Sequence, residues 1–276
     1  MTDTVQHEIQ SLPPHRRIKN PKFRRGIFLL PSMLTAANLL CGYYAVVATL
    51  SGGPDDFDHA AKAIGFAILF DSLDGRIARM TGTNTEFGVQ FDSLADVVSF
   101  GIAPAILAYA WGVKGLPLLT DTNGGHQLAE FGWICCLVFL VCCAWRLARF
   151  NVQGMAPGGS KFFVGMPTPA AAGVIASLVH RFKFPIEDWR WSVAWLVLAA
   201  CLGALMTSTI RYYSFKDLPW SRKQPSVGII LMLLIFGVTW RYSEYALMII
   251  ACSYAAVGLA LHVTRLLRHR LVSRTA

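Results

Sequence analysis

Long apolar stretches recur along this chain and limit the folds that it can adopt. They span residues 31–51, 59–80, 89–112, 131–150, 167–182, 191–212, 226–241 and 244–264. Most come near the ~20 residues that a helix needs to cross a hydrocarbon core. Lipid offers no partner for backbone N–H and C=O groups, so stretches of this length are expected to be helical. The sequence therefore predicts an all-α fold, a polytopic membrane helix bundle with about eight transmembrane helices.

The charged residues support this prediction and indicate an orientation. They make up only 15% of the chain, against roughly 25% in an average soluble domain. The net charge of +9 arises largely from basic residues near the two ends, at 16–25 and 265–274. Basic segments beside apolar spans usually face the cytoplasm. We therefore predict that the N- and C-termini are both cytoplasmic, and we expect no nucleic-acid partner.

Four aspartates interrupt the second and third apolar stretches. Asp71 and Asp74 are three residues apart, and Asp92 and Asp96 are four apart, so each pair lies on one face of a helix. A short loop around Gly82 would join the two helices as an antiparallel hairpin. Ionised groups in a bilayer are costly, and four of them repel one another unless cations neutralise them. The sequence therefore predicts that the carboxylates converge near the cytoplasmic end.

Carboxylate oxygens favour hard cations such as Mg²⁺, Mn²⁺ or Ca²⁺. Four carboxylates suggest two ions, and a pair of metal ions suits phosphoryl chemistry. A cation transporter could use the same residues, and Asp–Arg pairing between helices is the structural alternative. The arginines Arg76 and Arg79 are too few to neutralise four aspartates.

The residues around these four aspartates resemble the signature of a known family. The pattern Asp71-x2-Asp74-Gly75-x2-Ala78-Arg79-x8-Gly88-x3-Asp92-x3-Asp96 is similar at every fixed position to the signature of CDP-alcohol phosphatidyltransferases. The resemblance implies a helical membrane enzyme, usually a homodimer, that displaces CMP from a CDP-linked lipid with an alcohol. It also implies two divalent cations, Mg²⁺ or Mn²⁺.

Family roles are carried over only onto the positions that match. They make Asp71, Asp74, Asp92 and Asp96 metal ligands, with Asp96 also the general base. Contacts to CDP-diacylglycerol fall on Gly75 and Arg79 and on Thr85, while Thr35 and Asn38 of the first stretch lie beside the cytidine. A helix–helix hydrogen bond is the alternative role for Asn38.

A second region narrows the choice of acceptor alcohol. The segments Arg146-Leu-Ala-Arg149-Phe150-Asn151 and Phe163-Val-Gly165-Met-Pro167 resemble those of the bacterial phosphatidylserine synthase branch. This implies L-serine as acceptor and the bacterial cytoplasmic (inner) membrane as the location, with the active site on the cytoplasmic side.

The carboxylate of serine needs a fixed cation, and Arg146 and Arg149 lie one turn apart. Anchoring at the cytoplasmic face is their other possible role. Asn151 and Ser99 are further candidates for the headgroup site.

These observations divide the chain into four parts. Residues 1–26 form a basic cytoplasmic tail, with or without an interfacial helix, and 27–212 form the phosphatidyltransferase membrane core. Residues 213–264 add a transmembrane hairpin, and 265–276 form a second basic tail. Two alternatives to serine transfer stay open, namely another acceptor such as glycerol 3-phosphate or an inositol phosphate, and a divalent-cation transporter.

Overall fold

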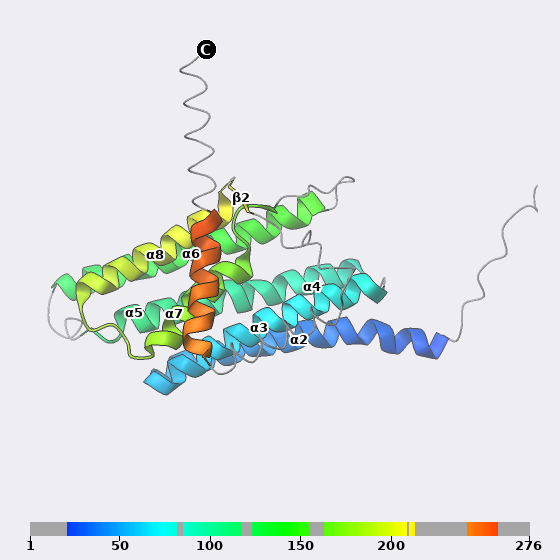
Figure 1. Cartoon of the computed structure of the whole chain (residues 1–276), viewed down its shortest axis with the longest axis horizontal. Helices are drawn as coiled ribbons and strands as arrows, with labels where there is room; N and C mark the ends of the chain where they lie inside the picture. The colour runs from blue at the N-terminus through cyan, green and yellow to red at the C-terminus, as the bar shows by residue number, and fades with distance from the viewer. Residues whose placement is uncertain are drawn as a thin grey trace, which may run out of the picture.

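Helices account for nearly all of the structure, a computed structural model that describes residues 21–81, 85–116, 123–154, 163–208, 210–212 and 242–258. The helices are α2 (Pro21–Ser51), α3 (Pro54–Thr81), α4 (Glu86–Asp96), the π-helical turn η1 (Val97–Ile102), α5 (Ala103–Val113), α6 (Asn123–Gly154), α7 (Thr168–Phe182) and α8 (Trp189–Thr207). A further helix, Ser243–Gly258, is called the 243–258 helix. The expectation of an all-α bundle is confirmed for this part of the chain (Figure 1).

Four of these helices are long and apolar enough to cross a membrane. They cover Ser32–Ser51, Glu86–Val113, Gly124–Val152 and Trp189–Thr207. α3 and α7 are not among these four. α3 occupies the second predicted stretch but carries its charged aspartates, and α7 has only 15 residues. The seventh stretch, 226–241, lies outside the described residues. The count of eight spans and the cytoplasmic termini therefore stay predictions.

The third predicted stretch is not one regular α-helix. Its middle, Val97–Ile102, is a π-helical turn in which the backbone N–H of Ala103 donates to the carbonyl of Val98. Pro104 lies in the first turn of α5, and proline has no N–H for an α-helical hydrogen bond. Such a turn changes the direction of the side chains around it and is common at functional sites. It begins directly after Asp96, the fourth aspartate of the motif.

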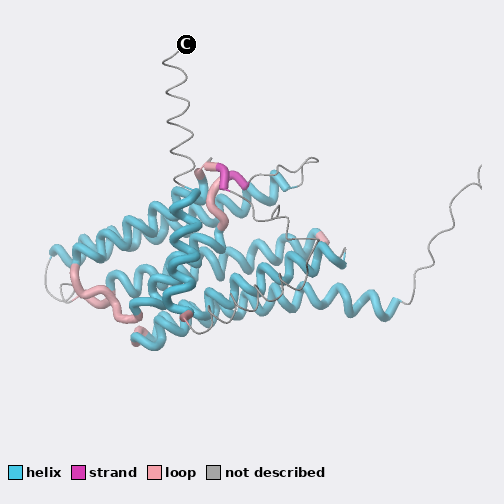
Figure 2. Tube along the Cα trace, in the orientation of Figure 1, coloured by secondary structure: helices cyan, strands magenta, loops and turns pink. Residues whose placement is uncertain are grey.

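Two very close approaches between segments are possible only because glycine has no side chain. In α2, a Cβ at Gly42 would lie 2.7 Å from the Cα of Ser99 in η1. Gly165 has φ +86°, and a Cβ there would lie 2.2 Å from the carbonyl oxygen of Met206. The backbone N–H of Gly165 donates to the carbonyl of Ile210 at 2.8 Å. This contact continues a two-residue antiparallel ladder between β1 (Phe163–Val164) and β2 (Arg211–Tyr212), drawn in magenta in Figure 2.

The long helices run roughly side by side, while the 243–258 helix crosses them steeply (Figure 1). α2 packs along α3 and also against α4, η1 and α5, and α6 packs along α8. α2 therefore lies beside both helices that carry the four aspartates, and it can supply polar side chains to them.

Candidate active site

Three of the four aspartates converge as the sequence predicts. Asp71 and Asp74 of α3 and Asp92 of α4 each offer a carboxylate oxygen, and these oxygens all lie within 4.8 Å of one another. One oxygen of Asp92, Oδ1, is buried and has no hydrogen-bond partner among the described residues. A buried carboxylate oxygen without a donor is costly, and a bound cation would satisfy it. The donor set and the spacing therefore fit a hard divalent cation.

Asp96 lies one turn beyond Asp92 and is buried. It is outside the group of three, but its carboxylate is within electrostatic reach of those of Asp71, Asp92 and Asp74. Its Oδ1 accepts a hydrogen bond of 3.0 Å from Nδ2 of Asn38. This bond restrains Oδ1 of the carboxylate and does not involve Oδ2.

α2 contributes two side chains to the aspartates from one face. The hydroxyl of Thr35 donates to Oδ2 of Asp74 at 3.0 Å, in the same way that Asn38 donates to Asp96. Both side chains are buried. The family resemblance implied that Thr35 and Asn38 lie beside the cytidine, with a helix–helix hydrogen bond as the alternative for Asn38. The structure shows a hydrogen bond from each of them to an aspartate on another helix. Their spacing of three residues puts them on one helical face, but spacing alone does not show whether that face contacts substrate or aspartates.

Ser99 is fully buried, and its hydroxyl donates to the backbone carbonyl of Asn38 at 2.9 Å. The hydrogen bonds thus continue from Ser99 through Asn38 to Asp96 and connect η1, α2 and α4. Ser99 was predicted at the headgroup site; in the structure its hydroxyl is engaged by the backbone of α2. The close approach at Gly42 brings the two helices near enough for this bond. Neither Gly42 nor its contact with Ser99 was predicted from the sequence.

The residues expected to contact CDP follow the first aspartate pair. Gly75 is half-buried in α3, directly after Asp74. Thr85 is the N-cap of α4, and its hydroxyl accepts from the backbone N–H of Gly88 at 3.0 Å. This bond gives Thr85 and Gly88 a local role in starting the helix that carries Asp92. Arg79 belongs to α3, but its side chain lies outside the described part of the structure.

The end of α6 brings two of its three predicted headgroup residues to the aspartates. Arg146 is within electrostatic reach of Asp96, and its Nε is buried without a hydrogen-bond partner in the described residues. Asn151 donates from Nδ2 to the hydroxyl of Ser93 at 2.8 Å, beside Asp92. Arg149 is half-buried one turn after Arg146. Ser93 was not predicted, because a serine between two motif aspartates has no distinctive spacing.

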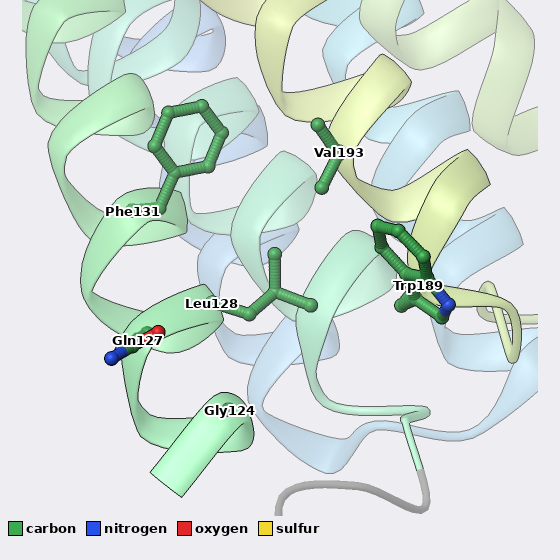
Figure 3. A pocket seen from close by; sticks show the side chains of 6 residues that line it. All are labelled: Gly124, Gln127, Leu128, Phe131, Trp189 and Val193. Atoms are coloured by element: carbon green, nitrogen blue, oxygen red, sulfur yellow. The ribbon is translucent and has the colours of Figure 1, made fainter.

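An apolar hollow of about 510 Å³ lies elsewhere, between the first turns of α6 and α8 (Figure 3). It is lined by Gly124, Gln127, Leu128, Phe131, Trp189 and Val193. Arg146 and Asn151 are near the other end of α6, a helix of 32 residues that is about 48 Å long at 1.5 Å per residue. The hollow is therefore remote from the aspartates and is not part of this site.

Comparison with known proteins agrees with the geometry. The model of the CDP-alcohol phosphatidyltransferase family matches residues 28–203. A Helicobacter pylori protein named CDP-diacylglycerol–serine O-phosphatidyltransferase is 32% identical over 211 residues, which are 76% of this chain and 82% of that protein. A protein of the same name from Mycobacterium leprae is 35% identical over 193 residues, 67% of this chain and 58% of its own length. The archaetidylserine synthase of Methanothermobacter thermautotrophicus is 36% identical over 198 residues, 70% of this chain and 73% of that protein.

Proposed function

The chain belongs to the CDP-alcohol phosphatidyltransferase family, and we propose that it transfers the phosphatidyl group of CDP-diacylglycerol to the hydroxyl of L-serine. The products are phosphatidylserine and CMP. The observation that carries this proposal is the cluster of Asp71, Asp74 and Asp92, with Asp96 oriented beside it by Asn38. Relatives from bacteria and an archaeon are named for transfer to serine or for archaetidylserine synthesis, which supports serine as the acceptor.

Asp71, Asp74 and Asp92 would hold one Mg²⁺ or Mn²⁺, and Asp96 with neighbouring carboxylates would complete a site for a second. Such ions neutralise the diphosphate and the charge that develops on the departing CMP. Thr35 restrains one oxygen of Asp74, so that a ligand carboxylate keeps its orientation before the cation binds. Gly75, Arg79 and Thr85 are proposed on the CDP side of this cluster.

Asp96 is the proposed general base. Since Asn38 occupies its Oδ1, its Oδ2 takes the proton from the hydroxyl of serine. The serine oxygen then forms a bond to the phosphorus that carries diacylglycerol, and the bond from this phosphorus to the oxygen of CMP breaks. An aliphatic hydroxyl is a poor nucleophile at neutral pH, so a base within reach is needed.

The negative charge of the serine carboxylate favours binding of the acceptor at the α6 side of the site. Nε of Arg146 is buried, has no hydrogen-bond partner among the described residues and is within electrostatic reach of Asp96, which suits the carboxylate of an amino acid. Arg149 and Asn151 are proposed as its neighbours around the headgroup, whereas the buried hydroxyl of Ser99 contacts the backbone of Asn38 instead. The enzyme would act as a homodimer in the bacterial cytoplasmic membrane with this site on the cytoplasmic side, and CDP-diacylglycerol would enter from the lipid.

One assay tests the proposal. Purified protein is incubated with CDP-diacylglycerol, Mg²⁺ or Mn²⁺, and labelled serine, glycerol 3-phosphate or inositol phosphate in turn. We expect CMP release and labelled lipid with serine alone. Product formed only with glycerol 3-phosphate or inositol phosphate would overturn the serine assignment within the same family. Absence of CMP release with every acceptor, together with cation uptake into vesicles, would favour a transporter.

A further inference from the structure

The 243–258 helix lies beyond the region that the family model covers, which ends at residue 203. It packs on the bundle through one side, where Ala251, Cys252, Tyr254 and Ala255 contact the buried core. In Figure 1 it is the orange to red helix that crosses α6 and α8. None of the carboxylates proposed for the transfer reaction belongs to this helix, so the helix must contribute something other than metal ligands.

Polar contacts hold the first turn of this helix. The hydroxyl of Ser243 pairs with Nε2 of His180 in α7 at 3.0 Å, and Nδ1 of His180 contacts the buried Asp58 of α3. Glu244 pairs with Lys183 at 2.8 Å. Specific contacts to α7 and the following residues therefore fix both the depth and the rotation of the helix.

The rotation fixed by Ser243 also decides where Tyr254 points. Eleven residues separate them in the sequence, close to three turns at 3.6 residues per turn, so both lie on the same face, about 16 Å apart. Ser243 faces α7, and Tyr254 accordingly faces the bundle. It is half-buried and packs on the core.

Arg146 connects Tyr254 to the proposed active site. The guanidinium of Arg146 is within electrostatic reach of both Tyr254 and Asp96, so it is near both the proposed base and this helix. Its Nε is buried and lacks a hydrogen-bond partner among the described residues. A buried guanidinium N–H that has no partner among the described residues, within electrostatic reach of a tyrosine, is well suited to a carboxylate, which can accept from both side chains.

We propose that Tyr254 is a specificity-determining residue of the acceptor subsite, where it donates, together with Arg146, to the carboxylate of the amino-acid acceptor. The inference rests on the proposed function. It gives the 243–258 helix a role: the family core performs the transfer, and this added helix completes the surface that selects an acceptor with a carboxylate. Ethanolamine has the hydroxyl and the ammonium of serine but no carboxylate, so it could not accept this hydrogen bond from Tyr254.

The test compares Tyr254→Phe with Tyr245→Phe. Tyr245 is on the same helix, where its hydroxyl accepts from Arg181 at 3.0 Å in the first turn, away from Arg146. We expect Tyr254→Phe to raise the KM for serine about tenfold, as for a lost hydrogen bond to a charged group. Its KM for CDP-diacylglycerol and its residual rate with ethanolamine should not change. Tyr245→Phe should leave all three values unchanged.

The outcomes separate this inference from the proposed function. A wild-type KM for serine in Tyr254→Phe would overturn the inference and leave serine transfer intact. An equal rise in the KM for CDP-diacylglycerol, or the same serine effect in Tyr245→Phe, would also overturn it, because the change would then be general. If the wild-type protein does not use serine at all, the proposed function itself is wrong.

Discussion

Replacement of Gly42 by alanine tests how α2 orients the proposed base. The added Cβ would lie 2.4 Å from Oγ and 2.7 Å from Cα of Ser99. The hydroxyl could rotate away, but the Cα belongs to the backbone of η1. Because carbon atoms pack best at about 3.5–4.0 Å, the two helices must separate by about 1 Å.

A separation of this size acts on both hydrogen bonds that lead to Asp96. The bond from Ser99 to Asn38 is 2.9 Å and the bond from Asn38 to Asp96 is 3.0 Å, so about 1 Å more would break the first and weaken the second. Overpacking of this kind costs about 1–3 kcal/mol of stability. Misplacement of a reacting group by about 1 Å can lower the rate about 100-fold. We therefore expect a lower melting temperature and a kcat reduced about 10- to 100-fold.

The assay is CMP release at saturating CDP-diacylglycerol and serine, with thermal unfolding of the same detergent-solubilised samples. Gly65→Ala in α3 is the matched control, because no described atom outside the nearby backbone of α3 lies within 4 Å of the Cβ added there; its kcat should not change. In Gly42→Ala, further replacement of Ser99 by alanine should not restore activity, since the contact with the Cα remains. Wild-type kcat and melting temperature in Gly42→Ala would refute the reasoning.

Three further predictions concern the carboxylates. Asp96→Asn should abolish CMP release while the protein still unfolds cooperatively near the wild-type temperature; full activity would contradict the role of base. Asn38→Ala removes the donor to Oδ1 of Asp96 and should lower kcat about tenfold, whereas an unchanged kcat would make this bond dispensable. Chelation with EDTA should abolish activity and Mn²⁺ should restore it, with Asp71→Asn requiring a higher Mn²⁺ concentration for half-maximal rate; activity that persists in EDTA would contradict a metal-dependent mechanism.

The convergence of the aspartates could be predicted from the sequence, because helical spacing places Asp71 with Asp74 on one face and a short connection folds the two helices together. The hydrogen-bond partners of these aspartates could not be predicted in the same way. Asn38 and Thr35 precede the motif in a stretch that is otherwise mostly apolar, and spacing alone could not distinguish contacts to substrate from contacts to aspartates. Their hydrogen bonds depend on how closely α2 approaches α4 and η1, a distance set by side-chain packing.

The residues determined that this chain forms membrane helices and carries a clustered carboxylate site, because hydrophobic length and helical period act locally along the chain. Only the tertiary structure decided that a π-helical turn follows Asp96, that the missing side chain at Gly42 lets Ser99 approach closely, and that Arg146 is within electrostatic reach of both Asp96 and Tyr254, more than a hundred residues later in the sequence. These features join segments that are distant in sequence. They depend on packing in three dimensions, which a one-dimensional pattern does not contain.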